Sequence, residues 1–315
     1  MSPSRAATLA ATLGAAVVCA VAAGPADAVT ASPAGFTIVN AASFEAGGAD
    51  SLAPGGFLTV FTDKAVTGES AKTFPFPGTK STPGGVRVST DGCRADLPTF
   101  DLDILYVGPA AGGGTQLNVY YPNSYQGGRN LEPTPCTNTA PSTVTVHPSA
   151  GLGPDLRKTF QIIAVQPGIF TADSSGTGVP AGYHQNAVTG EQTPLTTCNA
   201  DITGRACPVS TSGQQNFLVV FTTGAEMMGC PDNTVPCTTP FGQPTFFLGT
   251  PGSPPRTGIP QTTAFFGWAG FLGQEQANIQ LTPATPPGLN VLSVQVPSYL
   301  GHSARVLPVR LGTAA

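Results

Sequence analysis

The stretch Phe57–Thr62, with the sequence FLTVFT, returns 160 residues later as Phe217–Thr222, with the sequence FLVVFT. A second pair keeps the same spacing, because Gln116–Val119 (QLNV) returns as Gln276–Ile279 (QANI). The first pair is rich in β-branched and aromatic residues, which is typical of short buried strands. Two matches at one offset predict two tandem copies of one β-rich fold.

The composition supports this interpretation and limits the possible partners. A chain of 315 residues has room for about two domains of the usual size. Only 10% of the residues are charged, while 39 are Gly and 32 are Pro. Runs of Val, Ile, Phe and Leu favour many short strands and turns over disorder. The net charge is -4 and no basic run occurs, so we expect no nucleic acid as a partner.

Residues 1–28 predict a signal peptide. Arg5 precedes the apolar run Ala11–Gly24, and Ala26–Ala28 is a small-x-small cleavage site. The apolar run is shorter than the ~20 residues that span a membrane comfortably. We therefore expect a secreted protein that lies in the periplasm, on the cell surface or in the medium. We expect no transmembrane segment in the mature chain.

Six cysteines remain after that cleavage: Cys93, Cys136, Cys198, Cys207, Cys230 and Cys237. An even number in an exported chain predicts disulfides. Among the possible pairings, our hypothesis joins Cys93 to Cys136 in the first copy, Cys198 to Cys207, and Cys230 to Cys237 in the second. No Cys-x-x-Cys occurs and the histidines are scattered without ligand spacing. We therefore predict no metal site of this kind and no cofactor.

Short strands separated by turn signals predict a β-sandwich or a β-barrel. Strands are expected at 36–39, 57–62, 86–90, 100–107, 116–121, 144–146 and 160–165 in the first copy, and at 169–171, 217–222, 245–249, 263–267, 276–281, 290–296 and 304–310 in the second. A hairpin is expected around 186–190. No stretch of ten or more residues has helical periodicity.

Four stretches resemble the Solibacter-type uncharacterised C-terminal domain family of bacterial exported proteins. They are Val39–Ser43 with Ala53–Gly55, Leu105–Val119, Pro167–Thr171 and Gly267–Ile279, and the likeness spans roughly residues 36–312. The resemblance implies an all-β chain of two tandem immunoglobulin-like β-sandwich domains, which we place at 29–165 and 166–315. It implies no catalytic residues. The cysteine-bearing region 198–237 departs from the family pattern and could carry a function of its own.

Polar residues offer a few candidate sites. The pairs Gln116/Asn118 and Gln276/Asn278 each place both side chains on one strand face, where they could bind a ligand or stabilise turns through backbone hydrogen bonds. We favour the structural role. Asp101 and Asp103 also share a face and could bind calcium, but charges that discourage edge pairing are the favoured explanation.

Aromatic residues and histidines offer the other candidates. Trp268 and Phe271 could form a sugar-stacking platform, because the 160-residue offset aligns Trp268 with Gly108 and leaves the indole without a core counterpart. Tyr183 and His184 fall in a polar stretch that we interpret as a loop, and they could join a small ligand site. A serine hydrolase would need an activated nucleophile, and no Gly-x-Ser-x-Gly motif occurs.

These observations lead to a ranked set of functions. We expect a secreted, non-enzymatic surface or matrix protein that mediates adhesion or assembly through an extracellular polymer or a surface protein. The alternative is a carbohydrate-binding module that uses the exposed aromatics of the second domain. A further alternative is a hydrolase with an unusual site in the 172–240 loops.

Overall fold

The computed structural model describes residues 35–44, 51–53, 55–75, 78–91, 99–122, 141–163, 166–200, 216–224, 244–250, 258–268, 273–282, 284–285, 288–296 and 307–311. Of residues 198–200, 268 and 307–311 it describes the backbone alone. Several expectations lie outside these residues: the signal peptide, the side chain of Cys198, the other five cysteines of the predicted disulfides, and Phe271. We call residues 35–163 the first segment and residues 166–311 the second segment.

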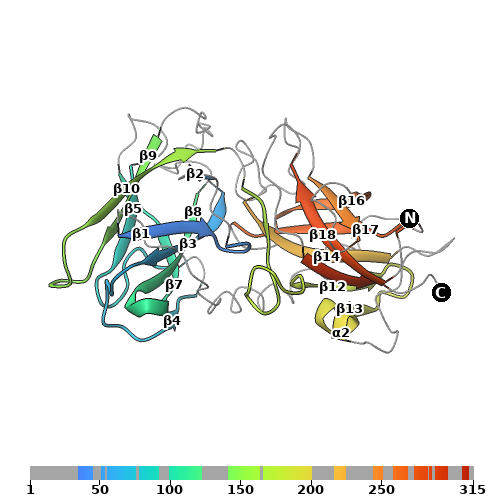
Figure 1. Cartoon of the computed structure of the whole chain (residues 1–315), viewed down its shortest axis with the longest axis horizontal. Helices are drawn as coiled ribbons and strands as arrows, with labels where there is room; N and C mark the ends of the chain where they lie inside the picture. The colour runs from blue at the N-terminus through green and yellow to red at the C-terminus, as the bar shows by residue number, and fades with distance from the viewer. Residues whose placement is uncertain are drawn as a thin grey trace.

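The described chain is all-β, with several sheets and almost no helix (Figure 1). The first segment has two five-stranded sheets, with the orders β1-β3-β8-β7-β4 and β2-β10-β9-β5-β6. The strands of the first sheet are β1 (Phe36–Asn40), β3 (Gly56–Thr62), β8 (Thr115–Tyr121), β7 (Asp103–Pro109) and β4 (Lys72–Thr73). The strands of the second sheet are β2 (Ser51–Leu52), β10 (Leu156–Ile162), β9 (Pro141–His147), β5 (Arg87–Thr90) and β6 (Phe100–Asp101).

The repeated stretch Phe57–Thr62 lies in β3, where every residue is buried. Successive side chains of a strand point to opposite faces. Leu58 and Val60 belong to the main core, which also contains Val88 and Val146 of the second sheet. Phe57 belongs to a separate buried cluster that contacts the second segment. One face of the stretch packs on the second sheet and the other on the second segment, which explains why both faces carry apolar residues.

The second segment has one continuous sheet in place of two. Its order is β13-β12-β14-β17-β16-β15-β18-β19, with β11 pairing to β14. The strands are β11 (Gly168–Ile169), β12 (Gly182–Asn186), β13 (Gln192–Pro194), β14 (Asn216–Thr223), β15 (Thr245–Gly249), β16 (Ile259–Trp268), β17 (Glu275–Gln280), β18 (Gly288–Gln295) and β19 (Leu307–Leu311), and a short helix α2 (Leu195–Ala200) follows β13. The ten-residue β16 joins the halves, because its start pairs with β15 and the rest with β17.

The 160-residue offset of the sequence is also the offset of the strand register. Leu58 lies opposite Val119, and the residues 160 positions later, Leu218 and Ile279, lie opposite each other. The order β1-β3-β8-β7 of the first segment returns as β12-β14-β17-β16 in the second. The repeat in the sequence is thus a repeat of four neighbouring strands.

The repeat is interrupted at its first strand. In the second segment β11 and β12 both pair with β14, and the chain between them leaves the sheet and returns. Thr171 and Pro180 close this excursion as an isolated bridge. An added Cβ at Gly176 would lie 2.8 Å from the Phe44 ring, so the excursion packs against the first segment. The sequence analysis placed these residues in a loop and did not identify the contact.

The two segments meet through a buried apolar cluster, which we call the segment interface. It consists of Ala41, Ala42, Phe57, Leu105 and Tyr120 from the first segment and Phe170, Ala181, Tyr183, Val219 and Phe221 from the second. The Phe57 ring lies 5.9 Å from the Tyr120 ring and 6.3 Å from the Phe170 ring. The amide of Phe57 donates to Thr223 Oγ1 over 2.8 Å. Apolar contact and hydrogen bonds therefore both join the segments.

Candidate functional site

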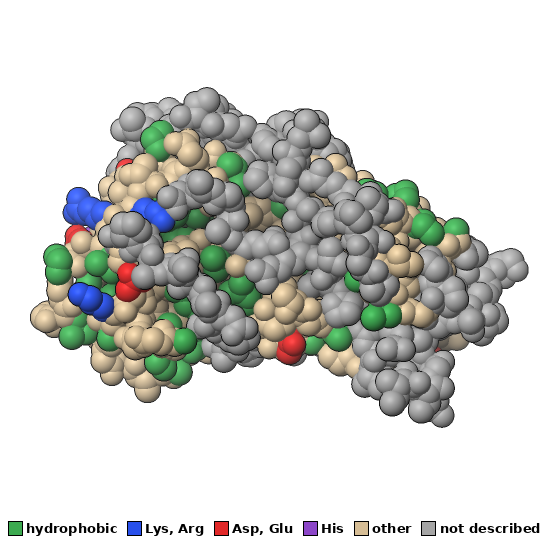
Figure 2. All heavy atoms as spheres, in the orientation of Figure 1, with side chains coloured by type: hydrophobic (Ala, Val, Ile, Leu, Met, Phe, Trp, Pro, Cys, Tyr) green, Lys and Arg blue, Asp and Glu red, His purple; other side chains and the backbone are tan. Residues whose placement is uncertain are grey.

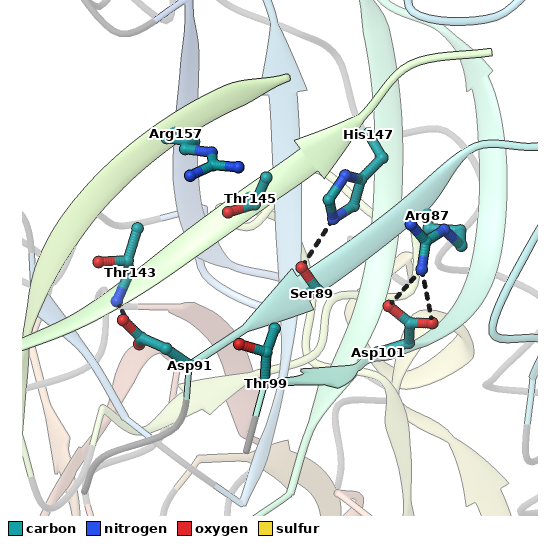
Figure 3. Close-up of a pocket in the computed structure, with 9 residues that line it drawn as sticks. All are labelled: Arg87, Ser89, Asp91, Thr99, Asp101, Thr143, Thr145, His147 and Arg157. Atoms are coloured by element: carbon teal, nitrogen blue, oxygen red, sulfur yellow. Dashed lines mark hydrogen bonds and ion pairs between the residues drawn. The ribbon is translucent and has the colours of Figure 1, made fainter. Parts of the chain in front are cut away.

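The outer face of the second sheet carries a polar groove (Figure 3). Strand alternation places the apolar Val88, Val144 and Val146 in the core and their neighbours on the opposite face. Arg157 lies opposite Thr145, Thr145 opposite Ser89, and Ser89 opposite Asp101. These four side chains form a polar row across β10, β9, β5 and β6. Arg87, Asp91, Thr99, Thr143 and His147 line the rest of the groove.

The groove has the size of a small-molecule site but not the usual lining. Its volume is about 460 Å³, within the range of ~300–1,000 Å³ that is common for ligand pockets. Such pockets are mostly apolar, whereas this groove is lined by hydroxyl, carboxylate, guanidinium and imidazole groups. A ligand would therefore be held by hydrogen bonds.

A chain of hydrogen bonds runs from the floor of the groove to its rim. Ser89 Oγ lies 2.8 Å from His147 Nε2. His147 Nδ1 lies 3.0 Å from Asp155 Oδ1. Asp155 Oδ2 also accepts a hydrogen bond from Arg157 Nη2 over 3.4 Å. Ser89 comes from β5, His147 from the end of β9, and Asp155 from the residue before β10.

The electrostatics of this chain favour an ionised Asp155. Desolvation raises the pKa of the carboxyl, but the hydrogen bond and the charge of His147, together with Arg157, outweigh it and hold the pKa below its ordinary value. An ionised carboxylate at Nδ1 accepts the N–H of that nitrogen. In the neutral ring with its proton on Nδ1, Nε2 accepts a hydrogen bond from the Ser89 hydroxyl.

A carboxylate with bound partners lies at each end of the groove. Arg87 Nη1 lies 3.2 Å from Asp101 Oδ2 at one end. Asp91 Oδ1 accepts the amide of Thr143 over 2.6 Å and the hydroxyl of Ser142 over 3.0 Å at the other end. The lining therefore includes two arginines and two aspartates, and their formal charges balance.

The two aspartates proposed from the sequence do not act together. Asp101 belongs to β6 in the second sheet and Asp103 to β7 in the first. Asp101 pairs with Arg87, while Asp103 Oδ2 lies 2.9 Å from Lys80 Nζ. Within the described ranges no group of three His, Cys, Asp or Glu side chains could hold a metal ion.

The repeated Gln and Asn side chains bond to each other. Gln116 Nε2 donates to Asn118 Oδ1 over 3.0 Å, and Gln276 Nε2 donates to Asn278 Oδ1 over 2.7 Å. Asn118 also accepts the Thr59 hydroxyl. Gln116 and Asn118 are buried. These bonds join neighbouring side chains and strands, where the sequence analysis expected bonds to the backbone of turns.

The alignment that set Trp268 apart is wrong by one residue. Tyr106 lies opposite Asn118 and Phe265 opposite Asn278, so these two aromatics correspond. Trp268, opposite Glu275, therefore corresponds to Pro109 and not to Gly108. The cause is the connection to the next strand, because β7 matches β16 at an offset of 159 residues and β8 matches β17 at 160, so the second connection is one residue longer. The side chain of Trp268 lies outside the described part of the chain.

Tyr183 and His184 are not in a loop. Both are buried in β12, between β13 and β14. Tyr183 belongs to the segment interface, and burial raises the pKa of its phenol. The expected hairpin is present next to them, because Asn186 and Glu191 close the turn between β12 and β13. The polar composition of the stretch hid β12, in which two successive side chains that point to opposite faces are both buried.

Sequence reasoning missed the groove, although two signals of it are visible. The alternating stretches Val86–Thr90 and Val144–His147 each carry a polar face, but only the register between the strands places Ser89 near His147.

Charged side chains are sparse on the face shown in Figure 2, in keeping with the low charge of the chain. No helix of the described residues is long and apolar enough to span a membrane. No family model matches the chain, and no curated protein matches it either.

Proposed function

We propose that this protein is a secreted surface or matrix protein that mediates adhesion or assembly, and that the groove on β5, β6, β9 and β10 is its contact with an extracellular polymer. We also propose that the two segments are tandem immunoglobulin-like domains, as the family resemblance implies, and that disulfides cross-link them internally, as the even number of cysteines indicates. The observation that carries the functional proposal is the polar row from Arg157 to Asp101.

The chemistry of the row favours a neutral, polyhydroxylated polymer. Each sugar hydroxyl both donates and accepts hydrogen bonds. The groove offers guanidinium donors, carboxylate acceptors and Ser or Thr hydroxyls that do both. Because the formal charges of the arginines and aspartates balance, the lining gives no preference for a strongly charged chain.

A pull-down against insoluble polysaccharides and cell envelopes tests this function. We expect saturable binding that Arg157→Ala and Asp101→Asn weaken by about tenfold each, since each removes hydrogen bonds to charged groups worth ~1.5–3 kcal/mol. Lys64→Ala is the matched control, because it removes one positive charge from an exposed residue outside the groove. Binding that survives both groove variants would refute this placement of the site.

The carbohydrate-binding alternative with Trp268 is tested in the same assay. If the indole stacks on a sugar, Trp268→Ala abolishes binding while Arg157→Ala leaves it intact. If the groove is the site, the two variants behave in the opposite way. No binding to any polymer by the wild-type protein would overturn both forms of polymer contact.

A further inference from the structure

We propose that Ser89 is an activated nucleophile and that the groove transfers acyl groups from small carboxylic esters. This inference goes beyond the proposed binding function and does not depend on it. It also departs from the expectation of a non-enzymatic protein, which rested on the β-sandwich repeat, the low charge and the absence of a recognisable catalytic constellation in the sequence. Ser–His–Asp sites are recognised by geometry and roles rather than by position in the sequence.

The geometry gives each of the three residues a distinct role. Ser89 Oγ is within hydrogen-bond distance of His147 Nε2, at 2.8 Å, which is the relation between a nucleophile and its general base. The opposite ring nitrogen bonds to the Asp155 carboxylate at 3.0 Å. That bond orients the imidazole and keeps the proton on Nδ1, so that Nε2 is free to take the serine proton.

The position of Ser89 limits the substrate. The residue is only 3% exposed, yet it lines the groove. An acyl group must therefore enter the groove to reach the hydroxyl, which favours short acyl chains on a polar alcohol. The backbone amides of β5 face its neighbours in the sheet, between β9 and β6. The donors available to a developing oxyanion are then the side chains of Thr145, Arg87 and Arg157, which line the same groove.

The reaction balances with water as the second substrate. Ser89 Oγ attacks the ester carbonyl carbon while its proton passes to His147 Nε2, and the Asp155 carboxylate stabilises the imidazolium. The bond from the carbonyl carbon to the alcohol oxygen then breaks, and the leaving alcohol takes the proton from Nε2. Water attacks the acyl-serine by the same route and releases a carboxylic acid and free Ser89.

The test is covalent labelling of the full chain with a fluorophosphonate, followed by intact mass measurement and peptide mapping. The wild-type protein should gain one adduct, on Ser89. His147→Gln should slow the labelling by about 10²-fold, the lower end of general-base contributions. Asp155→Asn should slow it less, and Ser89→Ala should abolish it.

Ser175 supplies the matched control. Its hydroxyl bonds directly to Asp173 Oδ1 over 2.8 Å, so it is a serine beside a carboxylate without an intervening histidine. Ser175→Ala should leave both the site and the rate of labelling unchanged. Circular dichroism and the urea midpoint of each variant show whether it is folded. The site of the adduct on the wild-type protein can be read without any variant.

Three results would overturn the proposal: no adduct on the folded wild-type protein, adducts spread over several serines and tyrosines, or equal Ser89 labelling in the wild type and His147→Gln. Hydrolysis of p-nitrophenyl acetate that Ser89→Ala abolishes would add support. Polymer binding by Ser89→Ala reports separately on the proposed binding function, so the two proposals fail independently.

Discussion

Replacement of Asn40 by Ala should destabilise the whole protein, because this side chain holds the two segments together. Asn40 is 1% exposed, and its Nδ2 donates to the carbonyl of Gln166 over 2.7 Å. Its Oδ1 accepts the amides of Ala42 and Ser43 over 2.8 and 3.1 Å. Three bonds at about 1 kcal/mol each give an expected loss of about 3 kcal/mol in the free energy of unfolding.

Asn186 is a close control for this change. Its Oδ1 also accepts two amides of the following turn, those of Val188 and Thr189, at the same 2.8 and 3.1 Å. The turn is exposed, so water can replace those bonds, and Asn186→Ala should lose about 1 kcal/mol or less. The measurement is urea unfolding followed by circular dichroism and by fluorescence. A difference between the variants below ~0.5 kcal/mol would refute the reasoning, since the bond to Gln166 and the burial of Asn40 would then contribute nothing.

Three further predictions concern stability. Phe57→Ala should lower the free energy of unfolding by about 3–5 kcal/mol, because it leaves a cavity in the segment interface; differential scanning calorimetry measures this, and a loss under ~1 kcal/mol would contradict the packing described. Gly224→Ala should be more destabilising than Gly190→Ala in the same assay. Both glycines have positive φ, +70° and +76°, but only at Gly224 would a Cβ meet a neighbour, 2.5 Å from the Gln166 carbonyl. The ionised Asp155, whose pKa is depressed in the folded state, contributes stability above the ordinary aspartate pKa of ~3.9 that is lost as the pH falls through the lower folded value. Asp155→Asn should therefore flatten the acid limb of stability against pH, and an unchanged limb would argue against the pair with His147.

The strands were predictable where the pattern of one strand decides its structure. Phe57–Thr62 and its repeat form β3 and β14, and Arg87–Thr90 forms β5, although only Arg87 of its expected wet face is exposed. The joining of strands into sheets was not predictable, because it depends on partners far away in the sequence. The continuous sheet of the second segment arises from the length of β16, which reaches both β15 and β17.

The candidate site was hidden for the same reason. Ser89 and His147 are 58 residues apart in the chain, and only the register of β5 against β9 brings their side chains together. The sequence analysis grouped His147 with the other scattered histidines. The prediction for Tyr183 and His184 was wrong for a different reason. Their polar sequence neighbours indicated an exposed loop, but tertiary packing buries both residues in β12.

The backbone of Gln166 is bonded on both sides of the boundary between the segments. Its amide donates to the Gly224 carbonyl of the second segment over 2.9 Å, and its carbonyl accepts from Asn40 of the first. A hinge requires backbone that is free to rotate, and this residue is not. The first segment, which carries the groove, is therefore held against the second both at Gln166 and at the apolar contact around Phe57. Rotation of one segment relative to the other would break these contacts, so the segments should behave as one rigid unit.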